Sequence, residues 1–280
     1  MARDARLSPL AAPMTDASSR SVAPQSSPIT LVAGPGGSGK TTWILQELQA
    51  QQANQRSAAY CALGTGTCAI DATWLQSHVS IEIVNETMGD RLLALVLEGV
   101  PVYLELGFYL DLGLMPPLLD ELDCRRVVVA ALEQASPWQN WATEWVPGRA
   151  SRVDCANADL WRGNLPGQVL DASSLDTAWL EIVGGAYGRV DRAKGLLPIA
   201  EGQTLLLNYV ASDQPSADGM VTELPLPLFT DGRPTGYAGL ELVGEALDRP
   251  ALVQLLRDCC LSDAELASAQ AQLQAAIAAS

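Results

Sequence analysis

The chain has 280 residues, 48% of them hydrophobic, and its 32 acidic and 17 basic side chains give a formal net charge of −15. A chain of this length can bury about three-quarters of its unfolded surface in one large domain or two smaller ones, and we expect two. The negative charge argues against a nucleic-acid partner or an anionic membrane surface, because the sequence shows no basic patch to overcome the repulsion.

Residues 1–27 are expected to form a disordered tail, because they are rich in Ser, Pro, Ala and Arg without an amphipathic period. A secretory signal is the alternative, but two prolines and a serine break the apolar stretch at residues 7–14. Asp4 and Asp16 argue against a transit peptide, since such peptides contain few acidic residues. The six cysteines have no C-x-x-C spacing, and we expect reduced thiols in a cytoplasmic protein.

A phosphate-binding loop follows the tail. Residues 29–42, ITLVAGPGGSGKTT, join an apolar strand to a helix start with the spacing G-x-x-x-x-G-K-T. The glycines allow consecutive N–H groups to converge on nucleotide phosphates, Lys40 adds a positive charge, and the Thr41 hydroxyl is placed to hold Mg²⁺. A chance glycine-rich turn is the alternative, but the flanking strand and helix argue against it. The predicted nucleotide-binding residues are Gly34, Gly36, Gly37, Ser38, Gly39, Lys40, Thr41 and Thr42.

Strands and helices alternate after the loop. We expect a helix over 41–53, strands over 58–62 and 81–84, a helix over 90–97, and buried strands over 100–106 and 126–131. Acidic residues and prolines interrupt the apolar region 92–119, so it is expected to be core rather than a membrane span. The pattern predicts an α/β P-loop NTPase domain over 28–174 with a doubly wound, mostly parallel sheet. Four tryptophans are expected to pack an irregular surface region rather than to stack on a base: Trp138, Trp141, Trp145 and Trp161.

The pattern changes beyond residue 175. A helix over 176–183 precedes four strands, over 195–200, 204–210, 220–226 and 239–243, and a helix over 249–260 follows them. Strands that no longer alternate with helices favour a smaller α+β domain over 175–262 with an antiparallel sheet. Residues 263–280 are expected to form a C-terminal helix or tail.

Three segments together resemble the CobW-type P-loop GTPases. They are the loop at 34–42, the run GGAYGRVDRAKG at 184–195, and LELVG at 240–244 with LDR at 247–249. The resemblance covers nearly all of residues 28–262. It implies an N-terminal GTPase domain, a smaller CobW C-terminal domain in which R-A-K-G starts a strand, and GTP with Mg²⁺ as ligands. It also implies a link to metal or cofactor homeostasis.

The resemblance assigns further site residues. Glu105 matches the acidic residue of the family's E-x-x-G switch and is a catalytic candidate and Mg²⁺ ligand, although Phe108 stands where the glycine is expected. Asp71 matches an aspartate of the first switch region. Asp159 is the remaining polar anchor of the guanine-reading N-K-x-D motif, and the N-cap of a short helix is its alternative role.

The family's C-x-C-C thiolate cluster is absent, because no cysteine stands between Cys68 and Cys124. We therefore do not expect a zinc site. His78, the only histidine, is expected to be a surface or packing residue, since no second ligand stands at a useful spacing.

These residues favour a Mg²⁺-dependent GTPase in which Lys40 and Glu105 are catalytic and hydrolysis is slow. The alternative is a nucleotide-binding regulatory or scaffold protein that hydrolyses little and binds an unknown protein partner through its C-terminal domain. A third possibility, an ATP-dependent kinase or transport ATPase, stays open because the guanine motif is incomplete.

Overall fold

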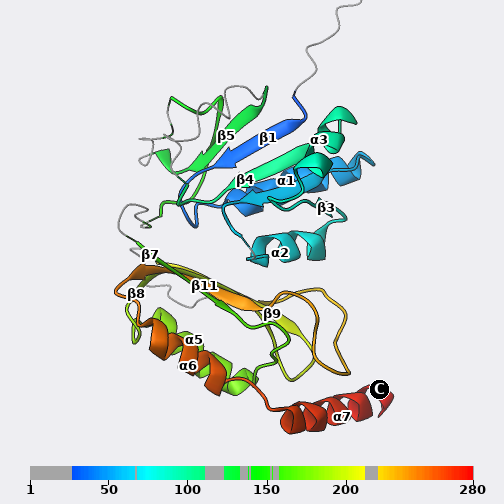
Figure 1. Ribbon diagram of the computed structural model, residues 1–280, viewed down its shortest axis with the longest axis vertical. Helices are drawn as coiled ribbons and strands as arrows, with labels where there is room; N and C mark the ends of the chain where they lie inside the picture. The colour runs from blue at the N-terminus through cyan, green and yellow to red at the C-terminus, as the bar shows by residue number, and fades with distance from the viewer. Residues whose placement is uncertain are drawn as a thin grey trace, which may run out of the picture.

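The computed structural model describes residues 27–66, 68–110, 123–132, 138, 140–151, 153, 158–211 and 220–279. The expected tail lies outside these residues apart from Ser27, as does Cys155. The described chain forms two β-sheets, each covered by helices (Figure 1).

The first sheet has six strands in the order β3-β2-β4-β1-β5-β6, and neighbouring strands are parallel. Its elements are β1 (Ile29–Ala33), α1 (Lys40–Ala53), β2 (Ala59–Leu63), α2 (Ile70–His78), β3 (Glu82–Ile83), α3 (Gly89–Leu97), β4 (Val102–Leu106), β5 (Arg125–Ala130) and β6 (Glu144–Pro147).

Both faces of this sheet are buried, as its continuous apolar strands predict. In the central strand β1, Leu31 and Ala33 belong to the core on one face, whereas Val32 belongs to the core on the other face. Successive side chains of a strand point to opposite faces, so one short apolar strand supplies both cores. This arrangement confirms the predicted parallel α/β sheet.

The second sheet has five strands in the order β10-β9-β8-β11-β7, and neighbouring strands are antiparallel. Its elements are β7 (Asp159–Asn164), α5 (Ala172–Val183), β8 (Arg189–Pro198), β9 (Thr204–Val210), β10 (Met220–Glu223), β11 (Gly239–Glu245) and α6 (Arg249–Asp258). A final helix, α7 (Asp263–Ala279), follows. The predicted α+β class of this half is confirmed, and the C-terminal segment is a helix.

Alternation along β8 determines what each face of the second sheet contacts. Ala193 and Leu197 lie in the core that α5 and α6 complete. Leu196 packs instead with Ile70 at the start of α2, and Lys194 on the same face pairs with a residue of α2. Figure 1 shows the consequence: α5 and α6 cover one face of this sheet, and the other face lies toward the first sheet.

The structure differs from the predicted elements in several places. The helix α2 and the short strand β6 were not predicted. We did not expect a strand at residues 159–164, yet β7 forms there and belongs to the second sheet, so the change of sheet occurs between β6 and β7. β8 begins at Arg189 rather than at residue 195. The prediction missed its first half because charged residues interrupt the apolar pattern there. The R-A-K-G run therefore lies inside the strand rather than at its start.

The four tryptophans pack against apolar side chains, but in the cores of the two sheets rather than in the irregular surface region that was predicted. Trp138, Trp141 and Trp145 contribute to a core of the first sheet, and Trp161 contributes to the core of the second. Among the residues that the structure describes, no helix has the length and apolar character needed to cross a bilayer.

Candidate functional site: a phosphate-binding loop that faces the second sheet

The loop between β1 and α1 depends on glycine at its first residue. Gly34 has φ of 142°, and a Cβ added there would lie 2.2 Å from the Val129 carbonyl oxygen. The close approach leaves no room for a side chain. Gly37 and Gly39 also have positive φ, at 80° and 104°, a conformation that L side chains rarely adopt.

Two buried polar groups point to an anionic ligand for this loop. The Lys40 ammonium is buried and donates hydrogen bonds to the carbonyl oxygens of Gly34 (3.0 Å) and Pro35 (3.1 Å). The Ser38 hydroxyl is also buried, and it has no hydrogen-bond partner among the described residues. Buried polar atoms are normally paired, so a phosphate oxygen would satisfy a group that the protein leaves unpaired.

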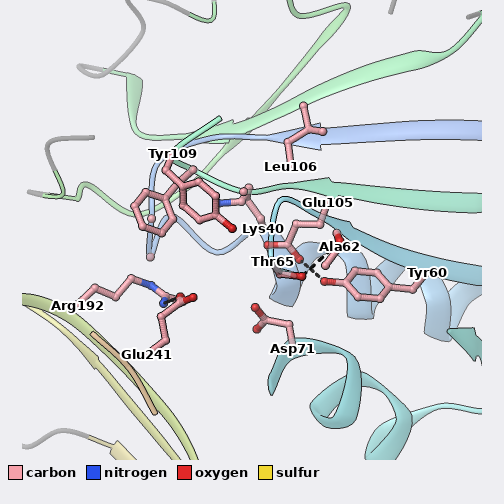
Figure 2. Close-up of a pocket in the computed structure, with 14 residues that line it drawn as sticks. Lys40, Tyr60, Ala62, Thr65, Asp71, Glu105, Leu106, Tyr109, Arg192 and Glu241 are labelled. Carbon is pink, nitrogen blue, oxygen red and sulfur yellow. Dashed lines mark hydrogen bonds and ion pairs between the residues drawn. The ribbon is translucent and has the colours of Figure 1, made fainter. Parts of the chain in front are cut away.

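The Thr41 hydroxyl, on the next residue, lies between two carboxylates. Its Oγ1 is 3.1 Å from Glu105 Oε1 and 3.3 Å from Asp71 Oδ1. The other oxygen of Glu105 accepts a hydrogen bond of 2.9 Å from the Tyr60 hydroxyl. Figure 2 shows Tyr60 of β2, Glu105 of β4 and Asp71 of α2 pointing toward one another. A hydroxyl with two carboxylates is a hard-oxygen set of the kind that Mg²⁺ prefers. The residues therefore fit both a phosphate chain and Mg²⁺.

The second sheet closes this site from the opposite side. Lys194 of β8 forms an ion pair with Asp71, and Arg192 and Glu241 line the same cavity as Lys40 and Glu105 (Figure 2). Val210, at the end of β9, lies against the loop, because a Cβ added at Gly37 would be 2.9 Å from its Cγ2.

The cavity between the loop and the second sheet measures about 40 Å³. A single water molecule needs roughly 10–15 Å³, so this space suits a few water molecules and is smaller than a triphosphate.

Burial and neighbouring charges shift the acid–base behaviour of the site. Burial lowers the pKa of Lys40 to about 8, against the attraction of Glu105, and the positive charges of Arg192 and Lys194 lower it further. Burial raises the pKa of Glu105, and the negative charge of Asp71 adds to this effect. For Asp71, burial opposes ionisation, but Lys194 and Arg192 outweigh it and hold the pKa of this carboxyl below its usual value.

Four of the eight predicted loop residues and Glu105 line the cavity or donate a side-chain hydrogen bond to a residue that lines it. Gly36, Gly37, Lys40 and Glu105 line the cavity, and Thr41 contacts Glu105. Thr42 is exposed on α1. The aromatic ring of Phe108 packs on the loop, because a Cβ added at Gly36 would lie 3.3 Å from its Cγ.

Asp159 lies outside the cavity that the loop lines. Asp159 is the first residue of β7, so its alternative role as a helix N-cap is wrong. Its carboxylate is 3.6 Å from Arg249 of the second sheet's helix layer and does not line the cavity described above. The proposed guanine-reading role of Asp159 stays a prediction.

Sequence reasoning missed five contributors to the site, which are Tyr60, Arg192, Lys194, Val210 and Glu241. Tyr60 stands in the middle of an apolar strand, where its ring is fully buried, and only the buried partner Glu105 gives its hydroxyl a role. Glu241 interrupts the buried strand β11, and a buried acidic residue in such a strand was a usable signal. Val210 carried no such signal.

The described part of the chain contains no group of three or more His, Cys, Asp or Glu side chains arranged to hold a metal ion. His78 is exposed at the end of α2, and its Nδ1 lies 2.8 Å from the Trp74 carbonyl oxygen and 3.0 Å from Ser77 Oγ. Its ring also lies against the Trp74 ring, with 5.1 Å between the ring centroids. These contacts agree with the predicted packing role.

Comparison with known proteins finds no matching family model and no match among curated proteins. Solved structures with a related arrangement include Zn(II)-bound YjiA GTPase from E. coli, at 10% identity and a TM-score of 0.30, and a Zn(II)-bound triple mutant of YjiA GTPase, at 11% identity and the same TM-score. Each match covers 82% of this chain and 98% of the other. Similarity at this level carries no argument about activity, which we base on the site itself.

Proposed function

We propose that the chain binds GTP together with Mg²⁺ at the loop and hydrolyses the nucleotide slowly. One observation carries the proposal: the Thr41 hydroxyl lies between the carboxylates of Asp71 and Glu105, next to the ammonium group of Lys40 in a glycine-dependent loop. The choice of GTP over ATP rests on the resemblance to CobW-type GTPases.

On binding, the Lys40 ammonium exchanges its two carbonyl partners for oxygens of the outer phosphates, and the loop N–H groups surround the phosphate chain. Thr41, with Asp71 and Glu105 behind it, would hold the cation, which when bound neutralises charge between the two outer phosphates. Lys40 and the loop N–H groups then stabilise the charge that develops as water attacks the terminal phosphorus in line.

Slow turnover is expected because the Glu105 carboxylate already accepts hydrogen bonds from both Thr41 and Tyr60. It is thereby held in place rather than free to orient a water molecule. P-loop proteins in which no side chain positions the water hydrolyse nucleotide slowly.

A second candidate function is a nucleotide-controlled regulatory protein with little hydrolysis, acting on a protein partner in the cytoplasm. The packing of Val210 against Gly37 favours it, because a phosphate chain bound on this loop would lie directly beside the second sheet. Binding energy would then be coupled to the position of this sheet, which a partner could recognise.

Purified protein separates these candidates. The affinities for Mg²⁺–GTP and Mg²⁺–ATP and the rate of phosphate release are measured for wild type and Lys40→Ala. Multiple turnovers that Lys40→Ala abolishes support the GTPase, and tight binding without turnover supports the regulatory protein. Absence of binding at millimolar nucleotide would overturn both, and preference for ATP would replace GTP as the ligand.

A further inference from the structure

Arg192 is a buried cation whose hydrogen-bonding capacity is not used by the described residues. Its side chain is 9% exposed, and its Nε is buried without a hydrogen-bond partner in the part of the chain that the structure describes. A guanidinium has five N–H donors in a rigid planar fork, a shape that matches phosphate oxygens. An unpaired donor of this kind inside a cavity indicates an anionic ligand.

The neighbouring carboxylate does not satisfy Arg192. Arg192 Nη1 is 3.7 Å from Glu241 Oε1, which is an ion-pair distance but too long for a hydrogen bond. Glu241 Oε2 accepts a hydrogen bond of 2.8 Å from Arg162 instead. Glu241 is thus shared between two arginines, and Arg192 is the one left without a direct hydrogen bond to it.

Arg192 also faces the phosphate-binding loop. It belongs to β8, on the face of the second sheet from which Lys194 reaches Asp71, and it lines the cavity together with Lys40 (Figure 2). The two side chains are close enough for the charge of Arg192 to help lower the pKa of Lys40. Asp71, Glu105 and Glu241 line the same cavity, yet none of them accepts a hydrogen bond from Arg192 Nε.

We propose that Arg192 binds the terminal phosphate of the bound triphosphate from the side of the second sheet, opposite Lys40, and so distinguishes triphosphate from diphosphate. This inference rests on the proposed function. In hydrolysis, the water oxygen forms a bond to the terminal phosphorus, the bond from that phosphorus to the bridging oxygen breaks, and the water proton passes to phosphate. Arg192 stabilises the charge on the transferred group, as cationic side chains do in phosphoryl transfer.

The same contact would make the second sheet responsive to the nucleotide. With a terminal phosphate present, Arg192 has a partner in the first sheet's site, which attracts β8 toward the loop. After hydrolysis and release of phosphate, this attraction is lost. The nucleotide can shift the equilibrium between positions of the second sheet only to the extent that its affinity differs between those positions.

The test compares wild type with Arg192→Ala, Arg192→Gln and Arg192→Lys. A matched control is Arg189→Ala on the same strand, because Arg189 is 57% exposed and pairs with Glu245 and Asp191 away from the cavity. The affinities for Mg²⁺–GDP and for a non-hydrolysable GTP analogue are measured by calorimetry, and hydrolysis is measured in single turnover.

We expect Arg192→Ala and Arg192→Gln to weaken binding of the triphosphate analogue by about 10- to 100-fold, the loss typical of a charge-assisted hydrogen bond. Affinity for GDP is expected to stay within about threefold of wild type, hydrolysis to fall by about 10-fold or more, and Arg192→Lys to lose less. Arg189→Ala is expected to match wild type in all three measurements.

Equal weakening for both nucleotides, or no weakening in folded variants, would overturn the inference. Arg192→Gln keeps a polar group beside Glu241 and serves as the test if Arg192→Ala does not fold. If wild type binds neither nucleotide, the proposed function itself fails. If wild type binds and hydrolyses GTP while the Arg192 variants are unaffected, only the role of Arg192 fails.

Discussion

Lys194 of β8 forms an ion pair with Asp71 of α2, 123 residues earlier in the chain. The side chains are 12% and 24% exposed, so the pair is largely shielded from water. The same oxygen of Asp71 lies 3.3 Å from the Thr41 hydroxyl. The Asp71 carboxylate therefore contacts both Lys194 of the second sheet and Thr41, the expected Mg²⁺ ligand. A movement of Lys194 would change the position of the carboxylate beside Thr41.

The ion pair is expected to stabilise the contact between the sheets. Lys194→Met and Asp71→Asn should each lower the free energy of unfolding by about 1–3 kcal/mol, because each leaves a partly buried charge without its partner. The double variant should lose less than the sum of the two, and urea unfolding of all four proteins measures this coupling. Arg91→Met, which breaks an exposed pair with Glu82, should have a far smaller effect. Strictly additive losses would contradict the prediction.

Nucleotide affinity is expected to fall above pH 8. Burial lowers the pKa of Lys40 to about 8, and the side chain faces Glu105, Asp71, Arg192 and Lys194. Binding of a polyanion favours charged Lys40, so the free protein must take up a proton when it binds above pH 8, and affinity should decline by up to about tenfold per pH unit.

Calorimetry at pH 8.5 in two buffers of different ionisation enthalpy counts the proton taken up. Lys40→Arg stays charged and should take up none. The pKa also predicts a stability effect: between about pH 8 and 10.5 the unfolded chain binds more protons than the folded protein, so the contribution of Lys40 to the free energy of unfolding rises with pH in that window. An affinity that is constant from pH 7.5 to 9 would argue against a titrating Lys40.

Gly34→Ala is expected to destabilise the protein by about 3 kcal/mol or more and to abolish nucleotide binding. The added methyl would lie 2.2 Å from the Val129 carbonyl oxygen, so the loop or β5 must move. Gly232→Ala is the matched control, since Gly232 has φ of 64° with open space around it and should cost only about 1 kcal/mol. Thermal unfolding of the two variants compares their losses in the free energy of unfolding. Similar losses would mean that the backbone at Val129 can move away from the added methyl group with little loss of stability.

Glu105→Gln is expected to lower the rate of hydrolysis without lowering the free energy of unfolding at pH 7. Because burial raises the pKa of Glu105, the folded protein binds protons more tightly here than the unfolded chain, and ionised Glu105 lowers stability as pH rises above about 4.5. Glutamine keeps partners for Thr41 and Tyr60 without the charge, so stability at pH 7 should be equal or higher, whereas Mg²⁺-dependent hydrolysis should fall. Unfolding at pH 5 and pH 7 with phosphate-release assays checks both parts. Full activity in this variant would remove Glu105 from the catalytic residues.

The loop and most strands and helices were predictable from the sequence because the signals that specify them are local. The glycine spacing at residues 34–39 indicates backbone angles that only glycine adopts easily. The apolar runs of β1, β4 and β5 indicate strands that are buried on both faces of the sheet. The helix α2, the strands β6 and β7 and the first half of β8 were not predicted. In β7 and in the first half of β8, charged residues interrupt the apolar pattern by which a strand is recognised.

Which side chains meet at the site was decided by tertiary structure alone. Arg192, Lys194 and Glu241 occupy alternate positions on two neighbouring strands, and strand alternation places them on one face without saying what that face contacts. Packing of Leu196 against Ile70 and of Val243 against Phe108 brings this face to the loop. The cations thus reach the loop by contacts between residues more than 100 positions apart, and no local pattern encodes such a pairing.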